Sequence, residues 1–152
     1  MDTLKECIKF ASEYPVCSIA TVERDQPRVR VVAMFLADET GFYFHTLAAK
    51  SFCRQMQKNN KVEVCFARSG QDLMELGPDT PLLLRVSGEV EFLSDPAIKS
   101  KILKDRPLQR EHYGIDSPED PRFVLFRIGK GEAFFWRGSD GTKEANIPRI
   151  KF

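Results

Sequence analysis

Apolar and polar side chains alternate most regularly between residues 82 and 92. Leu84 and Val86 occupy one side of that segment, whereas Arg85 occupies the other. Because successive side chains of a strand point to opposite faces, the segment is predicted to be a β-strand with one buried face. Similar runs predict further strands at residues 16–22, 28–36, 42–46, 61–67, 123–128 and 132–136. The last two are expected to form a closing hairpin around residues 129–131.

Apolar residues spaced three and four positions apart predict short helices between the strands. The first covers residues 3–13, where a threonine and a glutamate have the spacing of a capping box. A second is predicted over residues 49–58, with its apolar side chains on one stripe. Pro96 is expected at the first position of a third helix. The charged segment 105–121 is predicted to be a loop with some helix near residues 109–113.

Six or seven strands with turn signals and short helices predict a mainly β protein, an antiparallel barrel or sandwich. A chain of 152 residues is most simply one domain. Residues 68–81 include Gly70, Gly77 and Pro78, which favour turns, and this segment is expected to be a loop or an insertion. We find no internal repeat and no alternation of strands and helices that would predict a nucleotide-binding parallel sheet.

Composition excludes several classes of protein. A formal net charge of +1 argues against a dedicated nucleic-acid-binding protein, which needs a large basic excess. No apolar run approaches the length of about 20 residues that a membrane span requires, and residues 1–5 do not begin a signal peptide. The four cysteines are scattered without metal-ligand spacing. They predict free thiols in a cytoplasmic protein with no metal site.

A candidate anion site lies between residues 28 and 51. Arg28 and Arg30 are two positions apart on a predicted strand, so they point to the same face. The hairpin that follows leads to a helix start at Lys50 and Ser51, where free backbone N–H groups, a lysine and a hydroxyl suit a phosphate. The alternative is that both arginines form ordinary ion pairs with glutamates on neighbouring strands, such as Glu89, Glu91 or Glu132.

The order of these motifs resembles the FMN-binding split barrels of the pyridoxamine 5′-phosphate oxidase-like family. The resemblance spans about residues 10–137, and residues 138–152 form a tail beyond it. It is carried by Gln26-Pro27-Arg28-Val29-Arg30-Val31-Val32, Tyr43-Phe44-His45-Thr46, Lys50-Ser51, Leu84-Arg85-Val86-Ser87-Gly88, Ser94-Asp95-Pro96 and Phe134-Phe135-Trp136-Arg137-Gly138. It implies a six- to seven-stranded antiparallel split β-barrel and a homodimer that binds FMN at its interface.

The resemblance also implies which residues contact the phosphate of FMN. Arg30 falls at the strand position whose arginine contacts that phosphate in the family. Lys50 and Ser51 match the basic and hydroxyl positions that grip the same group. Arg28 is a further candidate, with ion pairing as an equal alternative.

Other residues fall at positions that surround the flavin ring in the family. Val31 and Val32 match positions whose main chain runs beside the ring. His45 and Thr46 take the place of the family's Tyr-Thr pair. Trp136 matches an aromatic residue that the partner subunit offers near the flavin, with a place in the core as the alternative.

Three departures separate the chain from the true oxidase. Phe35 replaces a lysine that helps to hold the vitamin phosphate, and Leu83 replaces a glutamine that touches the flavin. The C-terminal Arg-Leu-His-Asp-Arg ending of the oxidase is also missing. The scaffold therefore resembles the family, whereas oxidation of pyridoxamine phosphate itself is not expected.

These observations predict a flavoprotein in which bound FMN passes electrons from a reduced nicotinamide to a small acceptor. No residue is assigned a catalytic role, because the flavin carries the redox chemistry. One alternative is a protein that binds or senses flavin or haem without turnover. Another is a deazaflavin-dependent reductase. Its longer cofactor tail would require a wider basic groove, which could be extended by Arg54, Lys58 and Lys61. A structural dimer without any cofactor is the last alternative.

Overall fold

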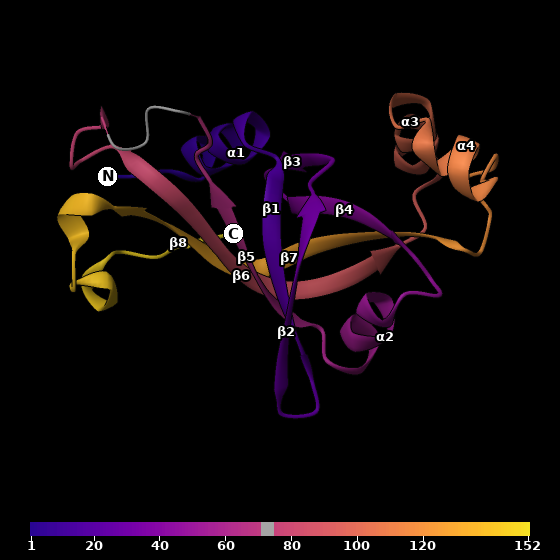
Figure 1. Ribbon diagram of the computed structural model, residues 1–152, viewed down its shortest axis with the longest axis horizontal. Helices are drawn as coiled ribbons and strands as arrows, with labels where there is room; N and C mark the ends of the chain where they lie inside the picture. Colours follow the sequence, from indigo (N-terminus) through magenta and orange to yellow (C-terminus); the bar gives the residue numbers. More distant parts are fainter. Residues whose placement is uncertain (71–74) are drawn as a thin grey trace.

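The computed structural model describes residues 1–70 and 75–152, and within them the chain is dominated by β-structure. The strands are β1 (Val16–Glu23), β2 (Gln26–Ala33), β3 (Leu36–Asp38), β4 (Gly41–Leu47), β5 (Lys61–Ala67), β6 (Pro81–Leu93), β7 (Phe123–Arg137) and β8 (Ile150–Lys151). All pair antiparallel in one sheet of order β2-β1-β5-β6-β7-β4-β3, and β8 pairs with β7 (Figure 1). The predicted mainly β, antiparallel fold class is confirmed.

Helices lie at the ends of this sheet. They are α1 (Leu4–Glu13), α2 (Ser51–Lys58), α3 (Pro96–Asp105) and α4 (Leu108–Tyr113), with 3-10 turns η2 (Gly138–Asp140) and η3 (Glu144–Asn146) in the tail. The predicted capping box is present at α1, where Thr3 Oγ1 accepts from Glu6 N–H and Glu6 accepts from Thr3 N–H. Figure 1 shows α3 and α4 side by side, on the opposite side of the molecule from the tail.

The predicted closing hairpin is wrong, because β7 is one continuous strand of 15 residues. Residues 130 and 131 form a bulge between the pairs Ser87–Glu132 and Glu89–Gly129 rather than a turn. A Cβ atom at Gly131 would lie 2.0 Å from the Ser87 carbonyl oxygen. The glycine is therefore required by the close approach of two strands, which the sequence alone does not distinguish from a turn.

The described residues form eight strands, whereas six or seven were predicted. The predicted strand 28–36 ends at Ala33, and Leu36 begins the short β3. The tail adds β8 next to β7. Within the predicted loop 68–81, residues 71–74 lie outside the described residues, and Thr80 N–H donates to the Gly77 carbonyl in a turn.

Two apolar clusters hold the fold together. The larger fills the sheet's interior with phenylalanines such as Phe42, Phe44 and Phe66. The smaller cluster packs Ile102 and Leu103 of α3 against the sheet, and it comprises Tyr43, Ile102, Leu103, Ile115, Phe123 and Leu125. It anchors the α3–α4 segment (residues 95–114) beside β4 and β7. Nowhere in residues 1–70 and 75–152 is there a helix with the length and apolar character of a membrane span.

Candidate functional site

A cavity of about 650 Å³ opens between β2, β4, the start of α2 and the α3–α4 segment. Six of the nine predicted site residues line it, namely Arg30, Val31, Val32, His45, Thr46 and Lys50. The other three, Arg28, Ser51 and Trp136, do not line it. The topology explains the convergence, because β2 and β4 flank the cavity and the turn after β4 leads directly into α2. The cavity has the size typical of small-molecule sites.

Arg30 carries a positive charge at the edge of this cavity without a carboxylate partner among the described residues. Its Nη1 donates to Thr21 Oγ1 at 2.7 Å, and its Nη2 donates to Gln55 Oε1 at 2.5 Å. The guanidinium Cζ lies 4.6 Å from the centroid of the Phe52 ring. Partial burial and the nearby charge of Arg28 lower the Arg30 pKa. An anion in the cavity would therefore relieve an uncompensated charge.

Arg28 has a different role in the structure. Its Nη2 lies 3.0 Å from Glu23 Oε2 across the β1–β2 hairpin, and both side chains are about half exposed. The glutamates suggested as alternative partners pair elsewhere: Glu89 with Lys61, Glu91 with Arg127 and Glu132 with Arg149. The alternative prediction, that Arg28 and Arg30 form ion pairs with those three glutamates, is thus wrong.

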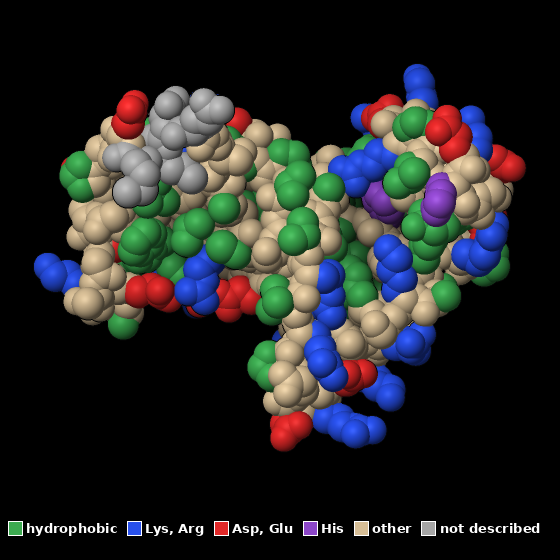
Figure 2. Space-filling view, viewed as in Figure 1, with side chains coloured by type: hydrophobic (Ala, Val, Ile, Leu, Met, Phe, Trp, Pro, Cys, Tyr) green, Lys and Arg blue, Asp and Glu red, His purple; other side chains and the backbone are tan. Residues whose placement is uncertain are grey.

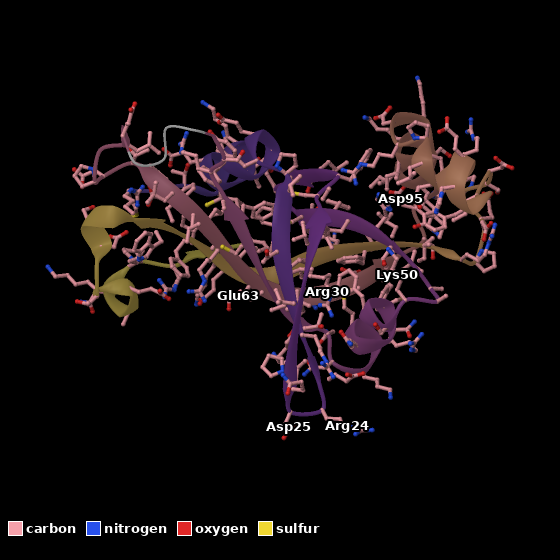
Figure 3. The ribbon with its side chains drawn as sticks, in the orientation of Figure 1. Arg24, Asp25, Arg30, Lys50, Glu63 and Asp95 are labelled. Carbon is pink, nitrogen blue, oxygen red and sulfur yellow. The ribbon has the colours of Figure 1, made fainter. Side chains whose placement is uncertain are left out.

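Lys50 is the N-cap residue of α2, and it makes no ion pair with any residue in the described ranges. Its side chain is exposed and lines the cavity, whereas Ser51 is exposed but lies outside the lining. The first backbone N–H groups of a helix have no partner within the helix. Lys50 and these groups together create a positive potential at one end of the cavity. Figure 3 labels Arg30 and Lys50 on the side of the molecule that carries α2.

His45 lies on β4 and is mostly buried in the cavity wall. Its Nε2 is 3.0 Å from Arg106 Nη1. Since a guanidinium can only donate, Nε2 accepts, and the ring proton of the neutral imidazole sits on Nδ1. Burial, followed by the charges of Arg106 and Lys50, lowers the His45 pKa to about 4. His45 is therefore uncharged at neutral pH.

Two residues at or beside this site, Arg106 and Gln55, were missed from the sequence. Arg106 ends α3 and donates to the main-chain carbonyls of Ala33 at 3.1 Å and Met34 at 2.6 Å, in addition to its contact with His45. These partners are more than 60 residues away in the sequence, and no local pattern connects them. Gln55 is different, because it is a polar residue next to the apolar stripe of α2. That position was a sequence signal for the buried side chain that the structure shows.

Trp136 lies at the far end of β7 from the cavity. It pairs with Leu83, whereas His45 pairs with Leu125 near the opposite end of the same strand. At the usual rise of a β-strand, positions 125 and 136 are separated by up to about 35 Å. One chain alone therefore does not bring Trp136 to its own cavity (Figure 1).

Comparisons with known proteins agree with this architecture. No curated protein sequence matches the chain. A nimC/nimA family protein from Clostridium acetobutylicum is 24% identical, with a TM-score of 0.70 over 97% of this chain and 91% of that one. PhzG from Burkholderia lata 383, solved with tetrahydrophenazine-1-carboxylic acid, is 20% identical, with a TM-score of 0.64 over 88% and 77%.

The haem storage protein HutZ from Vibrio cholerae is a third similar structure, 14% identical with a TM-score of 0.64 over 92% of this chain and 99% of that one. At such identities the three likenesses establish the fold alone. The family model described as pyridoxamine 5′-phosphate oxidase matches residues 3–137, which is most of the sequence and includes every strand that lines the cavity. The chain therefore belongs to the pyridoxamine 5′-phosphate oxidase family and has its split-barrel fold.

Proposed function

We propose that the chain is a homodimeric FMN-dependent oxidoreductase that passes electrons from a reduced nicotinamide to a small acceptor. The observation that carries this proposal is the pair of cations, Arg30 and Lys50, that both line a cavity of about 650 Å³. Neither has a carboxylate partner in the part of the chain that the structure describes. A phosphate dianion matches such a pair, and the rest of the cavity offers room for an aromatic ring system.

The donors available in the cavity fit FMN. Arg30 uses Nη1 and Nη2 for internal hydrogen bonds, whereas its Nε–H has no partner within the described residues and remains available to a phosphate oxygen. Val31 and Val32 line the cavity on edge strand β2, whose main-chain groups on the side away from β1 would suit hydrogen bonds to the polar edge of a flavin. Phe52 and Leu108 add apolar surface.

Bound FMN would supply the transfer of electrons, and the protein residues would bind and orient it. Arg30, Lys50 and the start of α2 hold the phosphate. His45 lines the cavity with an uncharged ring whose Nε2 accepts from Arg106. A neutral imidazole at this place leaves Arg30, Lys50 and Arg106 as the cations of the lining and adds no fourth positive charge.

A second copy of the chain is the partner that completes the proposed site. Val29 and Val31 on edge strand β2 are 71% and 68% exposed, and Val16 on β1 is 62% exposed. An exposed apolar edge strand favours association. A partner chain would also bring a Trp136 side chain within reach of a cavity that its own chain does not reach.

Haem binding is the second candidate, favoured by the neutral His45 in the cavity wall. Its Nε2 already accepts from Arg106 at 3.0 Å, so ligation of iron through that atom would require the contact to break. For this reason we rank FMN first. No group of three metal-ligating side chains occurs among residues 1–70 and 75–152.

The visible absorption spectrum of the purified protein tests the proposal. We expect flavin bands, release of FMN on heating, and bleaching of the bands by NADH or NADPH. A Soret band would identify the cofactor as haem instead of FMN. A deazaflavin spectrum would identify it as a deazaflavin. A colourless protein that fails to take up added FMN would refute the proposal.

A further inference from the structure

A second, smaller cavity of about 380 Å³ lies between the β1–β2 hairpin and α2. Three cationic side chains line it, Arg24 from the hairpin turn and Arg54 and Lys58 from α2. Figure 2 shows blue side chains gathered over the projecting hairpin and α2, and Figure 3 shows Arg24 at the tip of the hairpin. We call this cavity the hairpin groove.

Few of the charges that line the hairpin groove are neutralised by the described part of the chain. Glu23 is the carboxylate of its lining, and Arg28 already holds it at 3.0 Å. Arg54 Nη1 donates to the Ala49 carbonyl, which is uncharged. Within residues 1–70 and 75–152, none of the three lining cations forms a salt bridge. The hairpin groove therefore combines a concave shape with an excess of positive charge.

The backbone at Arg24 provides an independent observation. Glu23 pairs with Gln26, so Arg24 and Asp25 form a two-residue hairpin turn. Arg24 has a φ of 60°, in the left-handed region where such turns favour glycine or asparagine. An arginine that retains a conformation better suited to glycine indicates a use for its side chain.

The hairpin groove is next to the first cavity. Gln55 lines the hairpin groove, and its Oε1 accepts from Nη2 of Arg30, which lines the first cavity. The hydrogen-bonded pair of Arg30 and Gln55 thus separates the two cavities. A ligand with two anionic groups is able to place one on each side of this pair.

We propose that the hairpin groove binds a second phosphate-bearing group, the pyrophosphate or phosphate of a nucleotide. Its source is either the far end of an extended flavin cofactor or the dinucleotide that donates electrons. Anion binding in the groove stands on the groove's own residues, and only the assignment of these two sources rests on the proposed function.

Calorimetric titration of the purified protein with inorganic pyrophosphate and with ADP tests the anion site directly. We expect saturable binding that weakens as salt is raised, because exposed charges are screened. The substitutions Arg54→Gln, Lys58→Gln and Arg24→Gly should each weaken it by up to about fivefold, the upper range for an exposed charge pair. Lys5→Gln, on the exposed face of α1, is the matched control and should leave binding unchanged.

Arg24→Gly separates binding from folding. Glycine adopts the left-handed conformation without strain, so this variant should unfold at the same or a higher denaturant concentration than the original protein while binding pyrophosphate less well. Equal pyrophosphate binding by the original protein and by the variant that combines all three substitutions would overturn the proposal.

Two further measurements, a cofactor titration and steady-state kinetics, distinguish the two sources of the phosphate-bearing group. An extended cofactor predicts that FAD binds more tightly than FMN and that the triple variant loses this difference. A dinucleotide donor predicts an increased KM for NADH or NADPH in the triple variant, with unchanged affinity for FMN. FMN binding without pyrophosphate or ADP binding would refute the groove and leave the proposed function intact. Pyrophosphate binding without FMN binding would support the hairpin groove and refute the proposed function.

Discussion

Arg30 and Arg28 are two residues apart on one strand, but the structure gives them different surroundings. Arg30 lines the large cavity with no carboxylate beside it in the described residues, and Arg28 is paired with Glu23 at the surface. The substitutions Arg30→Ala and Lys50→Ala should each weaken FMN binding by about 1–3 kcal/mol, the usual loss for a charge-assisted contact. Fluorescence titration of FMN measures this loss.

Arg28→Ala is the matched control, because it removes an arginine from the same strand without touching the cavity. It should leave FMN affinity nearly unchanged. Equal losses in the Arg28→Ala and Arg30→Ala variants would show that general positive charge, rather than a site, determines the affinity.

His45 makes the stability of the protein depend on pH. Its pKa falls from 6.5 to about 4 in the folded state. Between these values the unfolded chain binds the proton and the folded chain does not, so the contribution of His45 is complete above pH 6.5 and is lost as the pH falls towards 4. Urea denaturation at pH 7 and pH 5 should show a smaller loss of stability for His45→Gln than for the original protein. The exposed His112, changed to Gln, should behave like the original.

At the scale of elements, the bulge in β7 contains a glycine that is sensitive to substitution. Gly131→Ala would place a Cβ 2.0 Å from the Ser87 carbonyl, so the backbone must move, and we expect a loss of about 2–4 kcal/mol. Gly129→Ala lies next to the bulge, where the nearest atom to the added Cβ would be 3.4 Å away, and this substitution should cost much less. Thermal or chemical unfolding of the two variants measures the difference, and similar losses would contradict this account of the bulge.

The helices and strands also show which features local sequence patterns predict and which depend on tertiary packing. The capping box of α1, the Asp95–Pro96 start of α3 and the alternation in β6 are local signals, and each element formed near its predicted bounds. The hairpin prediction at 129–131 failed because glycine serves both turns and close strand contacts. Arg30 and Lys50 were predicted from strand alternation and the helix start, whereas Val31, Val32, His45 and Thr46 were predicted only through the family resemblance, and all six line the cavity. Arg106 was missed since its contacts with Ala33 and Met34 depend on tertiary packing alone.

At the scale of the whole molecule, edge strand β2 is the expected contact between two chains. Val29→Lys introduces a charge into an exposed apolar edge, which should weaken dimer formation. Sedimentation velocity should then show a lower mass than for the original protein, together with weaker retention of FMN. Tyr113→Lys, at an exposed position on α4, is the control. A stable monomer that still holds FMN without substitution would contradict the expected dimer.

The route of the chain between β6 and β7 has a consequence for engineering. Leu93 and Leu125 are paired across the sheet where the chain leaves β6 and returns to β7. The register of the two strands is set by the ladder that ends at this pair, from Glu89–Gly129 to Leu93–Leu125. The excursion between these two leucines supplies Arg106 and Leu108 to the cavity wall. A grafted excursion that replaces Ile102, Leu103 and Ile115 with other apolar side chains over Tyr43, Phe123 and Leu125 would therefore change the molecules that the cavity admits and keep the smaller cluster filled.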